Sequence, residues 1–134
     1  MGEKKIVAFC CENSSYKAAE AVAVTESSVL DLVDIVRLPC SGKVEIGMVL
    51  KCLEKDHPGV LILSCPVDNC KYITGNVRAK KRVKMVKKAL QNAGIDENRV
   101  HMDFISSVDT YKFITIVKEM NDRLLKDRPP AGHD

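Results

Sequence analysis

The chain contains no tryptophan, and aromatic residues make up only 4% of its 134 residues. Binding single-stranded nucleic acid usually requires several aromatic side chains on which bases stack, so nucleic acid is not an expected partner. No apolar run approaches the roughly 18 residues that a membrane-spanning helix needs. The first residues, Met-Gly-Glu-Lys-Lys, do not resemble a secretory signal. We therefore expect a cytoplasmic protein without a membrane partner.

Several motifs that carry enzymatic chemistry are also missing. Neither GxGxxG nor GxxxxGK[ST] occurs, so both nucleotide-binding fingerprints are absent. No cysteine is followed by five residues and an arginine, the spacing that a thiol phosphatase needs. Paired CxxC knuckles, typical of structural zinc sites, are absent as well. The histidines give little support to a cysteine–histidine nucleophile, because His57 precedes Pro58, His101 lies in a predicted strand and His133 lies in the tail.

Strand and helix patterns alternate along the chain. Apolar residues make up 46% of the sequence, enough for the core of one domain. Short apolar runs predict strands at 4–11, 33–39, 59–64 and 99–106. An alanine-rich segment predicts a helix at 15–26. Three further helices are predicted from residues that recur at helical spacing, namely Ile46, Val49, Leu50 and Leu53; Ala79, Val83, Val86, Leu90 and Ala93; and Phe113, Val117, Met120 and Leu124.

Strand–helix units joined by short connections predict an α/β fold with a parallel sheet and right-handed crossovers. We predict a single flavodoxin-like domain over residues 1–126, with four strands in the order 2-1-3-4 and helices on both faces. The tail 127–134 contains two prolines and cannot continue a helix. In this order the first strand lies between the second and the third, so the carboxyl ends of these three strands are neighbours.

Five of the six cysteines lie at or just after the predicted ends of strands. They are Cys10, Cys11, Cys40, Cys65 and Cys70. Because the carboxyl ends of parallel strands share one edge of a sheet, these thiols are expected to converge there. Thiols stay reduced in the cytoplasm, which favours a metal or iron–sulfur site over disulfides. Cys52 lies within a helical pattern, next to Leu53, and we expect it to have no ligand role.

Iron–sulfur clusters are usually held by four cysteine thiolates. The candidate ligands are Cys11, Cys40, Cys65 and Cys70. Consecutive residues of a strand point to opposite faces, so only one of Cys10 and Cys11 is expected to reach the site. Zinc is the rival metal, and a phosphate-binding loop is the alternative interpretation of the segment 65–70.

Small and basic residues accompany these thiols. Ser41 and Gly42 follow Cys40 and permit a close approach of the backbone to a bound group. A run of cations without any acid predicts either a solvated helix face or a docking surface for an acidic partner. The helix start near Gly75 and these cations would also offset the charge of a bound anion. The run consists of Arg78, Lys80, Lys81, Arg82, Lys84, Lys87 and Lys88.

Four segments cover nearly the whole chain in a characteristic order: FCCENSSY (9–16), PCSGKV (39–44), SCPVDNCKYITGN (64–76) and NRV (98–100). Together they resemble the iron–sulfur delta subunit of methyl-viologen-reducing hydrogenase, a family that also serves heterodisulfide-reductase-type complexes. The third segment is the most specific. Three positions depart from the family pattern. Ser14 stands where the family often has a second cysteine, Lys71 replaces a histidine, and Lys43 replaces an arginine.

The resemblance implies one [2Fe–2S] cluster, with Cys11, Cys40, Cys65 and Cys70 as its ligands. The residues expected around the cluster or on a docking rim are Tyr16, Ser41, Gly42, Lys71, Tyr72 and Asn76. Cys10 and Ser14 are the reserve candidates for ligation. Lys71 would add positive charge near the cluster and raise its potential.

The implied function is electron transfer to or from a heterodisulfide-reductase-A-like flavoprotein that carries FAD and iron–sulfur clusters. The other redox partner would be a hydrogenase, a formate dehydrogenase or another oxidoreductase module, and the chain is not expected to be a catalyst by itself. Two alternatives stay open. One is a docking subunit that has lost its cluster, which Ser14 motivates, and the other is a cysteine-dependent enzyme on the same fold.

Overall fold

The computed structural model describes residues 4–40, 43–66 and 75–127. Within these ranges β1 (Ile6–Cys11), β2 (Val33–Leu38), β3 (Val60–Ser64) and β4 (Val100–Phe104) form one parallel sheet in the order β2-β1-β3-β4. The predicted α/β class, the four strands and their order are confirmed. The tail residues 128–134 lie outside the described part of the chain.

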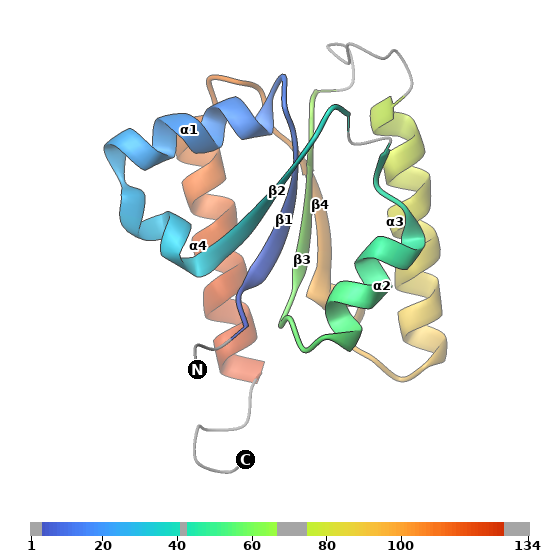
Figure 1. Cartoon of the computed structure of the whole chain (residues 1–134). Helices are drawn as coiled ribbons and strands as arrows, with labels where there is room; N and C mark the ends of the chain where they lie inside the picture. The colour runs from blue at the N-terminus through green and yellow to red at the C-terminus, as the bar shows by residue number, and fades with distance from the viewer. Residues whose placement is uncertain (1–3, 41–42, 67–74, 128–134) are drawn as a thin grey trace.

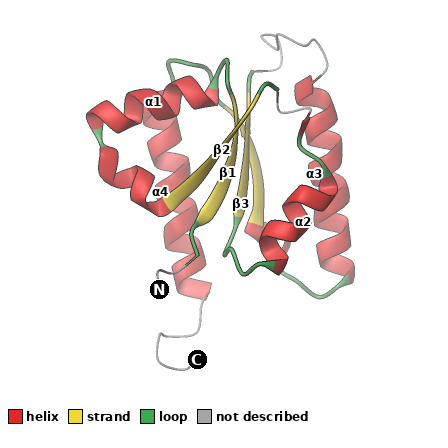
Figure 2. Ribbon diagram, in the orientation of Figure 1, coloured by secondary structure: helices red, strands yellow, loops and turns green. Residues whose placement is uncertain are grey.

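Helices cover both faces of the sheet (Figure 1). On one face lie α1 (Ser15–Thr25) and α4 (Thr110–Asp127), and on the other lie α2 (Ile46–Glu54) and α3 (Gly75–Asn92). Figure 2 shows this three-layer arrangement with the yellow strands between the red helices. Two 3₁₀ helices that the sequence patterns did not predict, η1 (Ser27–Leu32) and η4 (Glu97–Arg99), precede β2 and β4. Within the described ranges, no helix is long and apolar enough to span a bilayer.

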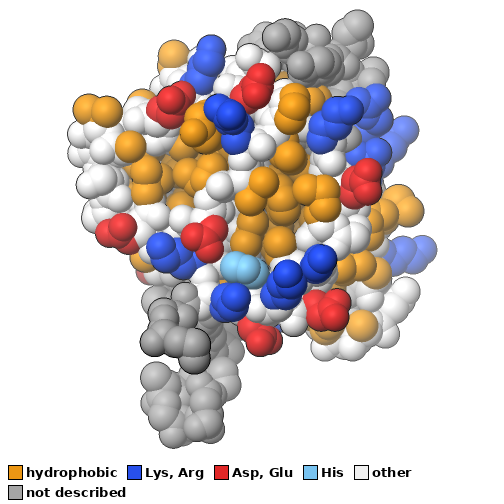
Figure 3. Space-filling view, viewed as in Figure 1, with side chains coloured by type: hydrophobic (Ala, Val, Ile, Leu, Met, Phe, Trp, Pro, Cys, Tyr) orange, Lys and Arg blue, Asp and Glu red, His pale blue; other side chains and the backbone are white. Residues whose placement is uncertain are grey.

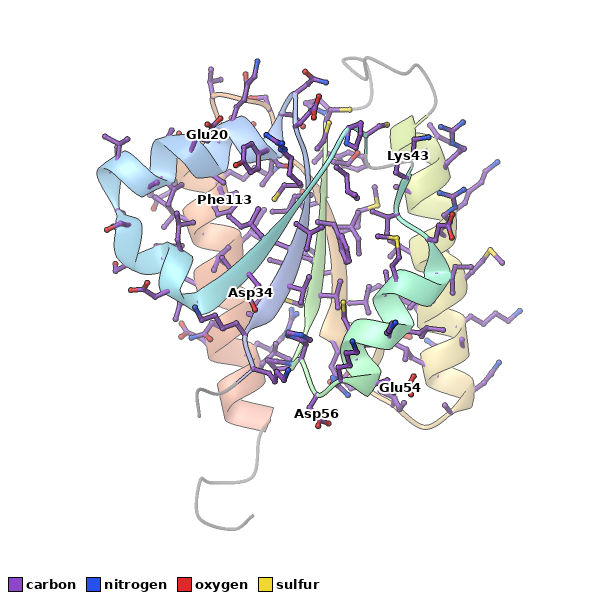
Figure 4. The ribbon with its side chains drawn as sticks, viewed as in Figure 1. Glu20, Asp34, Lys43, Glu54, Asp56 and Phe113 are labelled. Carbon is purple, nitrogen blue, oxygen red and sulfur yellow. The ribbon has the colours of Figure 1, made fainter. Side chains whose placement is uncertain are left out.

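The two faces of β1 supply two separate parts of the core. Ile6, Ala8 and Cys10 pack toward α1 and α4, whereas Val7 and Phe9 pack toward α2 and α3. Helices cover β1 on both faces, so each of its residues is buried. This burial explains why the sequence of the first strand is a continuous apolar run. On the α4 side the core is completed by the fully buried Phe113, whose side chain points from α4 toward the sheet (Figure 4).

Both α2 and α3 end with a left-handed residue and the same pair of backbone hydrogen bonds. After α3, Gly94 has φ of 75°, its N–H donates to the Gln91 carbonyl, and the next N–H donates to the Leu90 carbonyl. This is the Schellman arrangement. After α2, Asp56 occupies the corresponding position with φ of 72°, although it is not a glycine.

Candidate functional site

The carboxyl ends of β2, β1 and β3 lie next to one another, at the upper edge of the sheet in Figure 1. Cys11 is the last residue of β1, Cys40 follows the end of β2 by two residues, and Cys65 directly follows β3. All three side chains are buried, with at most 4% of their surface exposed. The sheet therefore brings three thiols that are distant in the sequence to one edge, as the strand order predicted.

The hydroxyl of Ser15 joins the ends of β1 and β3. It accepts a hydrogen bond from the backbone N–H of Cys11 at 3.0 Å and donates one to the carbonyl of Leu63 at 2.6 Å. Ser15 is the first residue of α1 and is fully buried. One side chain thus holds the backbone of a candidate ligand in register with the strand that leads to Cys65.

A tight turn follows Cys11 and leads into α1. The backbone N–H of Ser14 donates to the Cys11 carbonyl at 3.1 Å, and the N–H of Glu12 donates to the Leu38 carbonyl of β2 at 2.8 Å. The side chains of Asn13 and Ser14 each bring a polar group into this turn. Asn13 Nδ2 and Ser14 Oγ are buried and have no hydrogen-bond partner among the described residues.

Cys10 and Cys11 have different surroundings, as expected for consecutive residues of a strand. Cys10 is fully buried in the core beneath α1 and α4. The pKa of its thiol is raised to about 12, mainly because the thiol is buried. The Ser15 hydroxyl lowers this pKa, and the neighbouring Cys11 raises it further. The Cys11 thiol instead donates a long hydrogen bond of 3.9 Å to the carbonyl of Pro39, next to Cys40. Of the two, Cys11 is therefore the better placed to meet the other strand-end thiols.

The described residues that follow β2 make hydrogen bonds on two sides. The N–H of Lys43 donates to the Cys40 carbonyl at 3.0 Å. From α3, the guanidinium of Arg82 donates to the Val44 carbonyl at 2.8 Å. Lys43 lies at the same end of the sheet, near the start of α3 (Figure 4). Arg82 was predicted as part of an exposed basic run, but its hydrogen bond makes it a structural link between α3 and the Cys40 segment.

The other cations of the run lie on the outer surface of α3. Arg78, Lys80, Lys81, Lys84 and Lys88 are exposed, and Lys87 is half-buried. The helix sequence contains no Asp or Glu. Met85 is also exposed on this helix. Apart from Arg82, α3 therefore presents a positively charged surface. The fold agrees with both interpretations of the basic run, a solvated helix face and a docking surface for an acidic partner.

Tyr16 lies in the first turn of α1 and packs against the core of the α1–α4 face. The guanidinium of Arg37 from β2 lies over its ring, 5.3 Å from the ring centre. This cation–π contact links α1 to the edge strand. The predicted role of Tyr16 beside a cluster stays a prediction, and its described contact is with Arg37.

Several predicted site residues lie outside the described part of the chain, namely Ser41, Gly42, Cys70, Lys71 and Tyr72. Asn76 lies in α3, and its side chain is not described. Within residues 4–40, 43–66 and 75–127, no three His, Cys, Asp or Glu side chains form a group that could hold a metal ion. The fourth predicted ligand, Cys70, is not among these residues.

The chemistry of the described donors indicates which cofactor they suit. Cys11, Cys40 and Cys65 are thiols, and thiolates are soft ligands that prefer iron–sulfur clusters, zinc or copper(I) over magnesium or calcium. Their burial would shield a bound group from water. The three described thiols therefore have the donor chemistry that an iron–sulfur cluster needs.

Cys52 lies away from this edge, on α2. Its half-buried side chain lines a shallow groove of about 440 Å³. The groove lies over the middle of β1 and β2, and apolar side chains gather in this region with basic side chains beside them (Figure 3). Burial raises the pKa of the Cys52 thiol, while the nearby Lys55 lowers it. That Cys52 has no ligand role stays a prediction, and its described position is in this groove on α2. The groove is lined by Val7, Phe9, Asp34, Val36, Met48, Lys51, Cys52, Lys55 and His57.

Sequence reasoning missed Ser15 and gave no reason to notice Asn13. The only available signal was the pair of serines, Ser14 and Ser15, that begins three residues after the end of a buried strand. Ser15 contacts Leu63 of β3, which lies 48 residues further along the chain. A local sequence pattern could therefore not predict this contact.

Comparison with known proteins agrees with this geometry. Residues 6–126 match the family described as methyl-viologen-reducing hydrogenase, delta subunit. The chain is similar to the vhu iron–sulfur subunit of the F420-non-reducing hydrogenase from Methanopyrus kandleri, with 37% identity over 129 residues that cover 96% of this chain and 98% of the relative. The corresponding protein of Methanocaldococcus jannaschii is 36% identical over 124 residues, or 92% of each chain.

A different kind of relative contains a region like this chain within a longer protein. It is the A-type subunit of the ferredoxin/F(420)H(2)-dependent CoB-CoM heterodisulfide reductase from Methanosarcina acetivorans. The identity is 32% over 129 residues, which cover 96% of this chain but 16% of that protein. The same kind of domain thus occurs in two settings, as a separate subunit of hydrogenases and within a larger subunit of a heterodisulfide reductase.

Proposed function

Because the chain belongs to the family of methyl-viologen-reducing hydrogenase delta subunits, we propose that it is an electron-transfer subunit carrying one [2Fe–2S] cluster. The observation that carries this proposal is the set of buried thiols, Cys11, Cys40 and Cys65, at the ends of three adjacent strands. The related proteins from Methanopyrus and Methanocaldococcus are named iron–sulfur subunits, which supports a cluster of this general kind.

The proposed ligands are Cys11, Cys40, Cys65 and Cys70. When bound, a [2Fe–2S] cluster takes up and releases one electron. The residues of this chain would hold the group and limit its contact with water. Ser15 keeps the ends of β1 and β3 together, and the proposed surroundings are Tyr16, Ser41, Gly42, Lys71, Tyr72 and Asn76.

The proposed partners follow from the two kinds of relative. One kind is a subunit of a hydrogenase, which supports a hydrogenase as the electron donor. The other kind contains a similar region within the A-type subunit of a heterodisulfide reductase, which supports a flavoprotein of that type as the acceptor. A formate dehydrogenase or another oxidoreductase module is the further donor class. We place the exposed cations of α3 at the docking surface of one of these partners, since charged surfaces of this kind accelerate association with an acidic protein.

The domain is proposed to span residues 1–126, in keeping with the family match to 6–126, and the protein is proposed to act in the cytoplasm, where its thiols stay reduced.

Rapid mixing tests this function. The anaerobically purified protein is reduced, freed of excess reductant and mixed with an oxidised heterodisulfide-reductase-A-type flavoprotein while the flavin absorbance is recorded. We expect the flavin to be reduced by about one electron per chain, as a [2Fe–2S] donor requires.

Two variants serve as the matched comparison. Cys65→Ser removes a proposed ligand and is expected to abolish the transfer, whereas Cys52→Ser removes the groove thiol and is expected to leave it unchanged. A wild-type protein that holds iron and sulfide but never reduces the flavin would contradict the relay, and a protein that holds only zinc would indicate a structural site.

A further inference from the structure

The turn between β1 and α1 contains two polar groups that the fold leaves without partners. Ser14 is 4% exposed, and its Oγ has no hydrogen-bond partner among the described residues. The same holds for Nδ2 of the neighbouring Asn13. A third buried atom of this kind, Oε2 of Glu26, lies 2.9 Å from Nζ of Lys118 and so has an ionic partner. The unsatisfied pair is therefore confined, within the described ranges, to the edge that carries the thiols.

The position of Ser14 makes its lack of a partner informative. Ser14 is the N-cap residue of α1, where a serine hydroxyl usually accepts a hydrogen bond from a backbone N–H of the first turn. Here the side chain makes no such bond. Its backbone N–H donates to the Cys11 carbonyl at 3.1 Å, which keeps the residue close to the end of β1. The hydroxyl is thus a buried group on a residue whose backbone bonds to the proposed ligand Cys11, and it does not cap the helix.

The chemistry of the two groups indicates what they would bind. An amide NH₂ is only a donor, and a hydroxyl can donate one hydrogen bond. Leaving buried donors unsatisfied is costly, and such groups in proteins usually meet a bound group or an ordered water. The sulfur atoms of an iron–sulfur cluster and of its cysteine ligands are acceptors, and hydrogen bonds to them help to set the reduction potential.

We propose that Asn13 Nδ2 and Ser14 Oγ donate hydrogen bonds to the sulfur atoms of the cluster site at the end of β1, and thereby raise the reduction potential of the bound cluster. This inference rests on the proposed function. Hydrogen bonds to sulfur stabilise the reduced cluster more than the oxidised one, because reduction adds negative charge. Ser14 is then a donor to the site and not a ligand to iron.

The first test measures the reduction potential of the loaded protein by an EPR-monitored redox titration. Ser14→Ala is expected to lower the ratio of reduced to oxidised cluster at a fixed ambient potential by a factor of about five to ten, the effect of one lost hydrogen bond. Ser14→Thr retains a hydroxyl and is expected to restore the wild-type value. Asn13→Ala is expected to shift the potential in the same direction as Ser14→Ala. Ser28→Ala, a change at an exposed serine of η1, is the matched control and is expected to leave the potential unchanged.

Two further readouts separate this role from others. In the reduced protein, electron–nuclear double resonance is expected to detect an exchangeable proton coupled to the cluster that is missing in Ser14→Ala. In the protein without iron, Ser14→Ala is expected to leave the urea midpoint unchanged or raised, because no hydrogen bond is lost.

The outcomes that overturn the inference are distinct. An unchanged potential and proton coupling in Ser14→Ala would mean that the hydroxyl meets water or another group. Loss of iron from Ser14→Ala, with retention in Ser28→Ala, would make Ser14 a ligand. A lower urea midpoint of the iron-free variant would show that the hydroxyl already has a partner in the fold. A wild-type protein without iron and sulfide would overturn the proposed function together with this inference, whereas the other three outcomes leave the relay function intact.

Discussion

Ser15 and Leu63 are joined by a hydrogen bond of 2.6 Å between the Ser15 hydroxyl and the Leu63 carbonyl, although 48 residues separate them in the sequence. The same hydroxyl accepts a hydrogen bond from the backbone N–H of Cys11. The relationship matters because it fixes the spacing of two strands whose ends carry proposed ligands. A site made of residues from three strands depends on such links between the strands.

Ser15→Ala is therefore predicted to weaken both the fold and the site. It leaves a buried N–H of Cys11 without its partner, which costs about 1–3 kcal/mol in the free energy of unfolding. Urea denaturation of the iron-free protein measures this loss, and iron content after reconstitution measures the effect on the site. Thr25→Ala removes an exposed hydroxyl hydrogen bond at the end of α1 and is expected to cost at most about 0.5 kcal/mol. Equal losses in the two variants would contradict the role given to Ser15.

Charge reversal on α3 is predicted to slow association with an acidic redox partner. The double variant Lys80→Glu/Lys84→Glu changes two exposed residues one helical turn apart. At low ionic strength the association rate constant is expected to fall about tenfold or more, and the difference is expected to shrink as salt is added. The matched control is Lys51→Glu/Lys55→Glu, which makes the same charge change beside the groove on α2. If both variants slow association equally, net charge and not the α3 surface is responsible.

The ends of α2 and α3 predict opposite effects of glycine and alanine. Asp56→Gly is expected to raise the free energy of unfolding by about 1 kcal/mol, because a left-handed conformation is unfavourable for a residue with a Cβ atom. Gly94→Ala is expected to lower it by about 1 kcal/mol for the same reason. Both values come from urea denaturation curves. A destabilised Asp56→Gly variant would show that the aspartate side chain contributes more than its backbone strain costs.

Asp109 is predicted to make stability depend on pH at the start of α4. Hydrogen bonds from Ser106, first from its backbone N–H, hold the pKa of the Asp109 carboxyl below its ordinary value of 3.8. Since the pKa is lower in the folded protein, the stabilisation is fully present above pH 3.8 and is lost as the pH falls through the folded value. Asp109→Asn is thus expected to be less stable than wild type at neutral pH. The difference should diminish in acid, and a difference that stays constant to about pH 2 would contradict this assignment.

The strands and α-helices could be predicted because each follows from the residues of its own segment. β1 and β3 are buried on both faces, so they read as continuous apolar runs. The helices show apolar residues at helical spacing. Because strands and helices alternate along the chain, only a few parallel strand orders are possible. The structure has the predicted order, 2-1-3-4.

The rest depended on contacts between distant segments. The sequence suggested that strand-end thiols share an edge, and the positions of Cys11, Cys40 and Cys65 agree with this. It gave no means to see that Arg82 would turn from the basic surface toward the Val44 carbonyl. It also could not reveal that Ser15 would reach β3 while Ser14, one residue earlier, would be buried without a partner among the described residues. The η1 helix was missed because its short turn lacks the periodicity of an α-helix.

The most direct test of the central claim is an assay of iron and acid-labile sulfide, with a visible spectrum, on the anaerobically purified protein. We expect about two iron and two sulfide per chain, as one [2Fe–2S] cluster requires. We also expect both to be lost in each of the variants Cys11→Ser, Cys40→Ser, Cys65→Ser and Cys70→Ser, and to be retained in Cys10→Ala and Cys52→Ser. A wild-type protein without iron and sulfide, isolated within its intact complex, would contradict the electron-transfer function and leave a docking subunit.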